Sequence, residues 1–395
     1  TREEIRPEDS LDGIPEGVLA WAPSLTRSDY ERDLSAIRSY IAAGDTYQVN
    51  HTFRMSAELK ENAWAFYRAL CRSQKADYCA YIDTGRHRVL SASPELFFSL
   101  KKGRLTTRPM KGTHRRGRWP EEDDRFAAEL ARSEKNRAEN LMIVDLLRND
   151  LGRVSETGSV KVSDLWKVEP YETLFQMTST VESRMRDDVT LACLFEALFP
   201  CGSVTGAPKI RTMEIISEIE SEPRGVYTGT IGYVSPGGEA MFNVAIRTVA
   251  VDVASRRAVF GVGGGITWDS TSEDEYQECL TKARVLTERR PGFHLFETVR
   301  YDPGEGVFLW DRHLERLKRS ARYFGYPWDR ERVEALLVEA TAVCGDRARI
   351  KLMLESDGAM SQETGPLAPP GEYTVAVCPL RVDSSDIFLH HKTSH

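Results

Sequence analysis

The 395-residue sequence has no long apolar run, no concentrated positive charge and no paired cysteine motif, and each absence excludes a class of protein. No apolar stretch approaches the ~20 residues of a membrane-spanning helix, and the N-terminal stretch TREEIRPEDS is polar and acidic, unlike a signal peptide. Basic and acidic residues are interspersed around a net charge of -7, which leaves no basic footprint for phosphate backbones. We therefore expect neither a membrane nor a nucleic-acid partner.

The seven cysteines are odd in number and scattered without a C-x-x-C pair. This pattern disfavours a disulfide framework and a zinc site, because both use spaced cysteine pairs. It is typical of a reducing compartment, so the predicted location is cytoplasmic. Hydrophobic residues make up 41% and charged residues 29%, the balance of an ordinary globular protein.

The chain is longer than a single hydrophobic core normally supports, which predicts two units. Arg289, Arg290, Pro291 and Gly292 read as a linker between them. We therefore predict an N-terminal segment 1–23, a first domain 24–290 and a second domain 291–395. The first residue is Thr1 rather than Met, which indicates a trimmed or processed start.

Strand and helix patterns alternate irregularly along the chain. Residues 28–43 predict a helix with Ser28 and Glu31 as a capping box, ended by Gly44. Because strand runs and helix runs do not alternate regularly, we predict an α+β fold. The other predicted strands cover 78–82, 88–100 and 226–260 in the first domain and 293–299 in the second; the other predicted helices cover 121–154, 208–220 and 310–323, and a loop covers 365–371.

Three carboxylates lie on helix faces where they suit a metal ion. Glu139 shares a face with apolar residues, so its charge needs a partner, for which a salt bridge to Arg148 or to another basic residue is the ordinary alternative. Glu275 and Glu278 share a face with Lys282, although Ser272 and Glu275 also fit a capping box on a solvated helix. Together the carboxylates are the hard oxygen ligands that magnesium takes.

Lys111 and Glu95 are the candidate reactive side chains. Lys111 lies in the basic loop TRPMKGTHRRG, where neighbouring cations are expected to lower its pKa and free its amine, although most such lysines are simply solvated. Glu95 follows a proline at the end of a strand and is a candidate general acid.

Two glycine-rich strings are candidate binding segments. CGSVTGAPKIRTM places Pro208 as the first residue of a helix whose N-terminus suits an anion, or is simply capped. GVGGGI lacks the full dinucleotide motif and does not open a helix at once, so we reject a dinucleotide site and expect close backbone approach to a ligand.

Read in order, nine strings resemble the chorismate-binding enzyme family, which includes anthranilate, aminodeoxychorismate, isochorismate and salicylate synthases. The strings are GDTYQVN, SASPELFF, RPMKGT, AENLMIVDLLRNDLGRV, PCGSVTGAPK, GVYTGTIGY, FNVAIRT, GGGI and DSTSEDEYQECLTKA. The resemblance covers roughly residues 24–290. It implies an α+β fold in which two large antiparallel sheets pack together, flanked by helices, with the active site in a cleft.

The resemblance also implies roles for individual residues. Glu139 and Glu278, with Glu275 alongside, match magnesium ligands that bind the ring carboxylate of chorismate, and Glu95 matches the acid that assists departure of the carbon 4 hydroxyl. The residues that match substrate-binding positions are Gly112, Thr113, Tyr227, Arg247, Gly263, Gly264, Gly265 and Lys282.

Lys111 selects a branch of the family. Aminodeoxychorismate synthases carry lysine here and anthranilate synthases carry alanine, so the resemblance implies covalent catalysis on the route to 4-aminobenzoate and folate. A partner glutamine amidotransferase is implied, because the chain has no G-x-C-x-G motif. Anthranilate synthase component I and a non-catalytic chorismate-binding subunit are the competing interpretations.

Two departures from the family pattern stand out. Gln176 lies in QMTS where many relatives have a histidine, which preserves hydrogen bonding but not proton transfer. The segment before residue 24 is short, so we expect no regulatory tryptophan site.

From Phe293 onward the chain resembles the beginning of class IV aminotransferases, including aminodeoxychorismate lyase. Arg316 matches a residue that binds the phosphate of pyridoxal phosphate, and Lys392 matches its Schiff-base lysine. We expect this part to be incomplete and loose at its end, so that pyridoxal phosphate would serve only a complete lyase and this chain would not make 4-aminobenzoate.

Overall fold

The computed structural model describes residues 20–395 except 61, 75, 173, 288–291, 368–380 and 385. The chain forms two compact units. The first comprises residues up to Thr113 and Leu130–Arg290, and the second comprises His114–Glu129 and Pro291–His395. Most of the predicted linker lies outside the described residues. No helix in the described ranges is long and apolar enough to cross a membrane.

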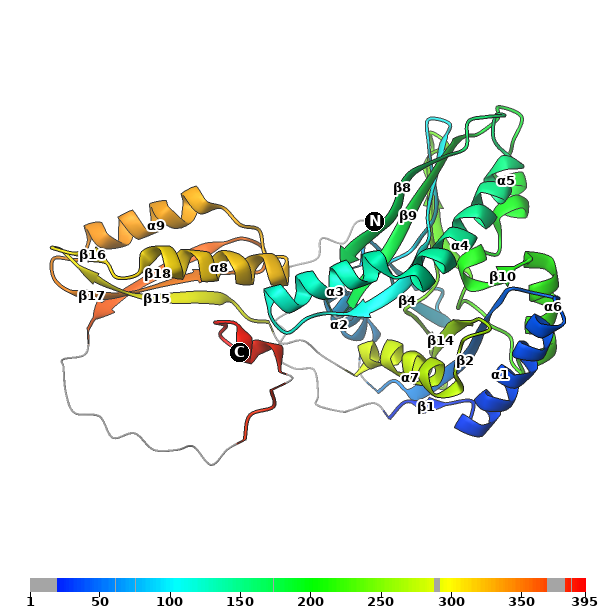
Figure 1. Cartoon of the computed structure of the whole chain (residues 1–395), viewed down its shortest axis with the longest axis horizontal. Helices are drawn as coiled ribbons and strands as arrows, with labels where there is room; N and C mark the ends of the chain where they lie inside the picture. Colours follow the sequence, from blue (N-terminus) through cyan, green and yellow to red (C-terminus); the bar gives the residue numbers. More distant parts are fainter. Residues whose placement is uncertain are drawn as a thin grey trace. The chain divides into compact units, whose positions relative to one another are not determined.

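Two large antiparallel sheets, each with seven strands among the described residues, build the first unit and confirm the predicted α+β class (Figure 1). The first sheet contains β1 (Ala22–Pro23), β2 (Gln48–Glu58), β14 (Arg257–Ile266), β13 (Thr248–Asp252), β4 (His87–Ser93) and β3 (Tyr78–Asp83) in that order, with β10 (Gly206–Ala207) beside β2. The second contains β11 (Thr230–Val234), β12 (Ala240–Val244), β5 (Leu96–Lys101), β6 (Arg104–Arg108), β9 (Leu174–Arg184) and β7 (Met110–Arg115), with β8 (Lys161–Pro170) beside β9.

Each sheet has its own helices and its own core. The first sheet packs with α1 (Arg27–Ala42), α2 (Ala63–Gln74), α6 (Lys209–Ile219) and α7 (Ser272–Ala283), and the second with α4 (Glu134–Gly152) and α5 (Leu191–Leu198). Phe53 and Phe260 are buried in the first core and Phe98 in the second, and burying one such ring contributes roughly 1.5–3 kcal/mol. Two short 3-10 turns, η1 (Gly202–Val204) and η2 (Arg284–Leu286), complete the unit.

Two predicted elements are each divided in the structure. The strand predicted over 88–100 is β4 and β5, which belong to different sheets and are separated by Pro94 and Glu95. The helix predicted over 121–154 is α3 (Pro120–Arg132) and α4, because the Ser133 hydroxyl accepts from Asn136 N–H and begins a new helix there. The first break places Glu95 where the chain passes between the sheets.

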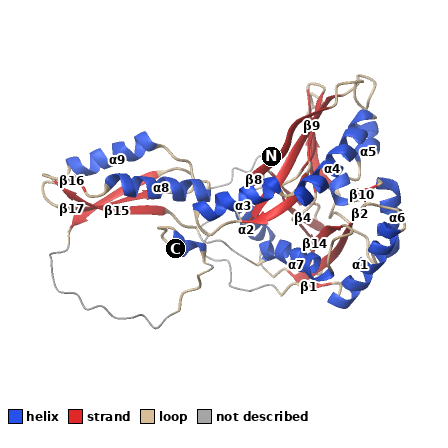
Figure 2. Ribbon diagram, in the orientation of Figure 1, coloured by secondary structure: helices blue, strands red, loops and turns tan. Residues whose placement is uncertain are grey.

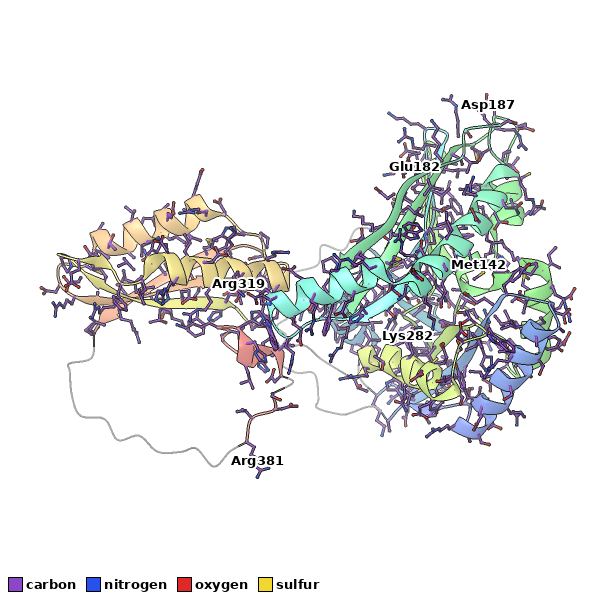
Figure 3. All side chains as sticks on the ribbon, viewed as in Figure 1. Met142, Glu182, Asp187, Lys282, Arg319 and Arg381 are labelled. Carbon is purple, nitrogen blue, oxygen red and sulfur yellow. The ribbon has the colours of Figure 1, made fainter. Side chains whose placement is uncertain are left out.

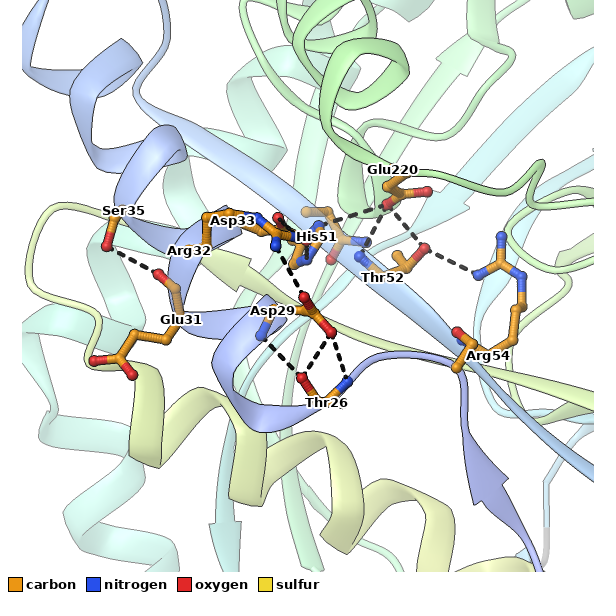
Figure 4. Close-up of polar contacts among 12 residues, drawn as sticks. Thr26, Asp29, Glu31, Arg32, Asp33, Ser35, His51, Thr52, Arg54 and Glu220 are labelled. Carbon is orange, nitrogen blue, oxygen red and sulfur yellow. Dashed lines mark hydrogen bonds and ion pairs between the residues drawn. The ribbon is translucent and has the colours of Figure 1, made fainter.

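Both predicted capping boxes are wrong by one or two residues. The N-cap of α1 is Thr26, whose backbone is extended, and it forms a capping box with Asp29 (Figure 4). The N-cap of α7 is Thr271, whose hydroxyl accepts from Asp274 N–H. The strings TRSD and TSED, which begin at the observed N-caps, have the same residue spacing as the predicted capping boxes. Spacing alone therefore could not distinguish the observed caps from the predicted ones.

A buried polar network ties β2 to α1 and to the end of α6 (Figure 4). His51 Nε2 lies 3.4 Å from Asp33 Oδ2, and the Thr52 N–H and hydroxyl both donate to Glu220 at 2.9 Å. Arg54 Nη1 donates to the Thr52 hydroxyl at 3.1 Å. Because buried polar groups are stable only when paired, this network fixes the strand that runs beside β14.

The second unit is a four-stranded antiparallel sheet with helices (Figure 2). Its strand order is β16 (Gly306–Val307), β15 (Leu295–Asp302), β17 (Ala348–Leu354) and β18 (Met360–Pro366). It also contains α8 (Trp310–Phe324), α9 (Arg330–Ala342), η3 (Ile387–His390) and most of α3. Leu314 and Leu317 are buried, as predicted for the helix that carries them, whereas the predicted loop 365–371 begins within β18 and its residues 368–371 lie outside the described chain.

Candidate active site

A cavity of about 340 Å³ lies in the first unit and brings together every first-unit site residue that the sequence predicted. Its predicted lining residues are Glu95, Lys111, Gly112, Thr113, Glu139, Gln176, Tyr227, Arg247, Gly263, Gly264, Gly265, Glu275, Glu278 and Lys282. They come from strands of both sheets, from α4 and α7, and from the connecting segments that carry Glu95, Tyr227 and Arg247. Residues far apart in the sequence therefore converge on one space, as a ligand site requires.

Lys111 lies on β7 with its amine inside the cavity. Its Nζ is 3.9 Å from Glu139 Oε2, so the cluster of cations that the sequence suggested is replaced by an ion pair with a carboxylate. The Lys111 carbonyl accepts from Asn140 Nδ2 at 3.3 Å, which ties the strand to α4. This ion pair is the ordinary alternative expected for Glu139, a salt bridge to a basic residue, but the partner is Lys111 and not Arg148, which pairs with Asp145 at 2.8 Å.

The glycine run of β14 lets backbone approach the reactive groups. A Cβ added at Gly265 would lie 2.2 Å from Lys111 Nζ and 2.8 Å from Gln48 Nε2. A Cβ added at Gly264 would lie 2.9 Å from Glu275 Oε2. Only glycine therefore allows the β14 backbone to lie this close to the Lys111 and Glu275 side chains, and the expected approach of this backbone to a ligand remains a prediction.

We expect Gly265→Ala to lower turnover at least about tenfold, because the new methyl must displace the Lys111 amine and small misplacements of reacting groups are costly. Steady-state kinetics and thermal unfolding would be measured for this variant and for Gly237→Ala, whose added methyl meets nothing within 4 Å. Equal turnover in the two variants would show that the methyl does not disturb the amine.

Glu95 is buried at 3% exposure, and its Oε1 has no hydrogen-bond partner. Burial raises the pKa of Glu95 to about 7, although hydrogen bonds from Ser203 and the Met110 backbone and the charge of Lys111 act in the other direction. A carboxyl group with this pKa carries a proton at neutral pH for an appreciable fraction of the time, which suits a general acid.

Glu139, Glu275 and Glu278 all line the cavity and are oxygen donors of the kind that magnesium takes. Burial raises the pKa of Glu275, whose Oε1 accepts from the Ser270 hydroxyl, and the Lys282 ammonium lowers the pKa of Glu278. Within the described chain no three metal-ligating side chains meet at one point. The three side chains have the oxygen chemistry that magnesium takes, but Glu139 and Glu278 are ion-paired with Lys111 and Lys282, and a magnesium ion would have to compete with these two lysines.

Arg247 and Lys282 provide positive charge in the cavity. Arg247 has a backbone φ of 50°, a region that costs a non-glycine residue about 1–3 kcal/mol. Its Nη1 donates to the Lys282 carbonyl at 2.6 Å, and Lys282 Nζ donates to the Gly263 carbonyl at 2.9 Å (Figure 3 labels Lys282 on α7). Strained backbone held by such contacts is typical of a site that presents charge to a ligand.

The remaining predicted residues shape the walls. Gly112 has a φ of 98°, and a Cβ there would meet Asn136 at 3.0 Å. Gln176 Nε2 donates to the Gly112 carbonyl at 3.2 Å, so this amide positions the backbone next to Lys111. The Tyr227 ring lies so close to Gly261 that an added Cβ would be 2.1 Å from it.

Sequence reasoning missed Gln48 and Ser203. Gln48 is fully buried, neither atom of its amide has a hydrogen-bond partner, and its Nε2 lies near Gly265 and the Lys111 amine. Such a side chain is costly unless a ligand completes its hydrogen bonds. Both residues lie in strings that carry the family resemblance, GDTYQVN and PCGSVTGAPK. No pattern in these strings indicated that the two side chains point toward the site.

The anion site predicted at the start of a helix after CGSVTG is not formed as expected. Pro208 is the N-cap of α6 rather than its first helical residue, with an extended ψ of 137°. Gly206 and Ala207 instead pair with β2, and η1 brings Ser203 and Val204 to the cavity. The string therefore contributes to the wall through a turn and a short strand.

In the second unit, Arg316 and Lys392 meet at a buried carboxylate. Arg316 donates to both oxygens of Glu297 at 2.6 and 2.5 Å, and Lys392 Nζ is 3.7 Å from Oε2. Because the Arg316 guanidinium is held by Glu297, a phosphate would compete with this pair. The described residues therefore do not fit pyridoxal phosphate as they stand.

The end of the chain is held in place, contrary to the expectation of a loose tail. Phe296 N–H donates to the Lys392 carbonyl at 3.1 Å, and Thr393 pairs with Leu295. A cavity of about 330 Å³ in this unit is lined by residues of α8 together with Trp328 and Arg330, and neither Arg316 nor Lys392 lines it.

The two antiparallel sheets, with a cavity lined by residues of both, are the fold and the site of a known enzyme family. Residues 8–288 match the family described as chorismate binding enzyme, and the chain belongs to this family. Residues 294–393 match the family described as amino-transferase class IV.

Similar proteins include aminodeoxychorismate synthases and anthranilate synthases. The chain is 45% identical over 271 residues to aminodeoxychorismate synthase of Streptomyces griseus, covering 67% of this chain and 37% of that protein. It is 42% identical over 268 residues to aminodeoxychorismate synthase component 1 of Salmonella typhimurium, covering 68% and 59%. The crystal structure of anthranilate synthase component I from Streptococcus pneumoniae TIGR4 is similar with a TM-score of 0.65 and 38% identity, covering 70% of this chain and 61% of that chain. The chain spans less than two thirds of each of these proteins.

Proposed function

We propose that this chain aminates chorismate at carbon 4 to give 4-amino-4-deoxychorismate, with Lys111 as a covalent nucleophile. The observation that carries the proposal is the place of the Lys111 amine, which lies against Gly265 in a cavity that also contains Glu95. The similarity to aminodeoxychorismate synthases supports it. Lys111, which the family resemblance assigns to that branch, supports it as well.

In the proposed first step the Lys111 amine attacks carbon 2 of chorismate, the ring double bonds shift, and the carbon 4 hydroxyl leaves as water with a proton from Glu95. Ammonia then attacks carbon 4, the double bonds shift back, and the carbon 2 to nitrogen bond breaks. The lysine amine is regenerated. Covalent catalysis divides one difficult displacement into two easier ones.

The substrate carboxylates have complementary partners in the cavity. Arg247 and Lys282 present positive charge, and Tyr227 presents a hydroxyl. Magnesium held by Glu139, Glu275 and Glu278 would neutralise the ring carboxylate.

The proposed source of ammonia is a glutamine amidotransferase on another chain. No G-x-C-x-G nucleophile string occurs in the sequence, so this chain has no cysteine in the setting that glutamine hydrolysis uses. We propose that the two chains form a complex in which the second supplies ammonia to the cavity.

The acid role of Glu95 predicts a characteristic pH dependence. Because burial raises the pKa of Glu95 to about 7, its carboxyl group carries a proton below that pH and loses it above. We expect the ratio of wild-type turnover to Glu95→Gln turnover to be about 10²–10⁴ at low pH and to fall roughly tenfold per pH unit above about 7. Measuring both proteins across the range removes any effect of Lys111 common to both. A ratio that is constant with pH would rule out the proton transfer.

The proposed activity is tested by identifying the product. The purified chain is incubated with chorismate, magnesium and ammonium, and the products are separated and identified by mass spectrometry. We expect 4-amino-4-deoxychorismate. Anthranilate as the main product would instead establish the second candidate, which the similarity to anthranilate synthase component I favours.

A further inference from the structure

We propose that the second unit holds residues 116–124 in place and thereby orders the strand that carries Lys111. This segment lies in the sequence between Lys111 and Glu139, yet it belongs to the second unit. Strand β7 runs from Met110 into the start of the second-unit segment at His114. The inference does not depend on which reaction the first unit carries out.

Tyr323 at the end of α8 makes the central contact with the segment. Its hydroxyl donates to the Gly117 carbonyl at 2.5 Å, and its own carbonyl accepts from Arg116 Nη2 at 2.9 Å. The Arg116 guanidinium also lies over the Tyr323 ring, 4.7 Å from its centroid. Tyr323 is buried at 7% exposure, so these hydrogen bonds are shielded from water.

The segment is itself a tight turn that this contact completes. Arg116 donates to both oxygens of Asp123 at 2.8 and 2.6 Å, and Gly117 N–H donates to the same carboxylate at 2.8 Å. A Cβ at Gly117 would lie 2.2 Å from Asp123 N. Arg116 thus joins the turn to α8. Loss of its hydrogen bond to the Tyr323 carbonyl would leave the nearly buried Arg116–Asp123 ion pair with one hydrogen bond fewer.

Arginines of α8 pair with carboxylates of α3, and these pairs favour one orientation of the two helices. Arg322 donates to Asp124 at 2.8 Å, and Arg319 donates to Glu121 (Figure 3 labels Arg319). These pairs are exposed, and exposed pairs contribute little free energy. They favour one orientation, while Tyr323 and Arg116 provide the buried contact.

The C-terminal residues His390 and His391 also pack against the segment 116–124 and against Tyr323. The His391 ring packs on Tyr323 with centroids 4.4 Å apart, and His391 Nδ1 lies 3.0 Å from the Ser320 hydroxyl. His390 packs on Trp119, with centroids 5.2 Å apart. Burial lowers the pKa of His391 to about 4, so this ring is neutral and packs as an uncharged aromatic group. The tail that carries Lys392 therefore holds the segment as well.

Two matched variants of the full chain test the proposal. Tyr323→Phe removes the hydroxyl that binds Gly117, and Tyr326→Phe removes a similarly buried hydroxyl that donates to the Phe293 carbonyl at 2.8 Å. Hydrogen–deuterium exchange would be followed in peptides covering residues 110–113 and 116–124. We expect about fivefold faster exchange in both peptides for Tyr323→Phe and no change for Tyr326→Phe, since loss of one buried hydrogen bond favours local opening.

Each other outcome overturns the proposal. Unchanged exchange at 116–124 in Tyr323→Phe would show that α8 does not hold the segment. Faster exchange at 116–124 with unchanged exchange at 110–113 would show that the contact is structural and does not reach the strand with Lys111. Equal effects of the two variants would show general loosening of the second unit. Because exchange is measured without substrate, failure of the proposed amination would leave this test unaffected.

Discussion

Lys111→Ala is expected to lower the rate of 4-amino-4-deoxychorismate formation by a factor on the order of 10³ or more, because the proposed intermediate forms on its amine. Lys282 cannot replace it. Its Nζ is already bound to the Gly263 carbonyl at 2.9 Å and to Glu278 at 2.7 Å. The rate would be measured with ammonium as the nitrogen source, so that no second chain is required.

Two further variants separate the amine from its charge and from general effects. Lys111→Arg retains positive charge but not a nucleophilic amine, and it should be as inactive as the alanine variant. Lys161→Ala removes an exposed lysine from β8 and should remain fully active. An alanine variant at position 111 that kept near wild-type product formation would exclude the covalent route.

Glu139→Gln and Glu278→Gln are each expected to raise the magnesium concentration required for half-maximal rate about tenfold or more, because each removes an anionic oxygen from a hard-cation site. Glu139 Oε2 lies 3.9 Å from Lys111 Nζ, and Glu278 pairs with Lys282. Both glutamines keep the size of the side chain, so the cavity wall is preserved. Turnover would be titrated with magnesium after treatment with chelator.

Asp145→Asn is the matched control for the metal experiment. Asp145 lies on α4 with Glu139 but is exposed and pairs with Arg148, so its loss should leave the magnesium dependence unchanged. Full activity of the Glu139 and Glu278 variants in chelator would show that these carboxylates serve only the ion pairs seen in the structure.

The fold class and the members of the site could be predicted because they rest on ordered strings. The α+β class and the residues of the cavity follow from strings such as RPMKGT and GGGI. Each string is short and contiguous, so its site residues can be recognised without knowledge of the fold. The magnesium assignment remains a prediction, because the cavity carboxylates supply only the oxygen donors that the ion takes. The pyridoxal phosphate assignment also remains untested, and the pairing of Arg316 with Glu297 in the described residues does not favour it.

The remaining features depend on contacts between residues far apart in the sequence. Ion pairing of Lys111 with Glu139 arises from the packing of β7 against α4, and nothing local in its basic loop indicated it. The burial of Gln48 follows from its direction on β2 beside the glycine run. The assignment of segment 114–129 to the second unit depends on Arg116 and Tyr323, which are separated by more than half of the chain.

The most direct test of the central claim is the mass of Lys111 during the reaction. Wild-type chain is incubated with chorismate and magnesium without ammonium, quenched, and digested for peptide mass spectrometry, with Lys111→Arg as the control. We predict that the wild-type peptide containing Lys111 gains the mass of chorismate less one water and that the modification disappears when ammonium is added. An unmodified Lys111 in a preparation that forms 4-amino-4-deoxychorismate, or a modification that persists with ammonium, would contradict the account.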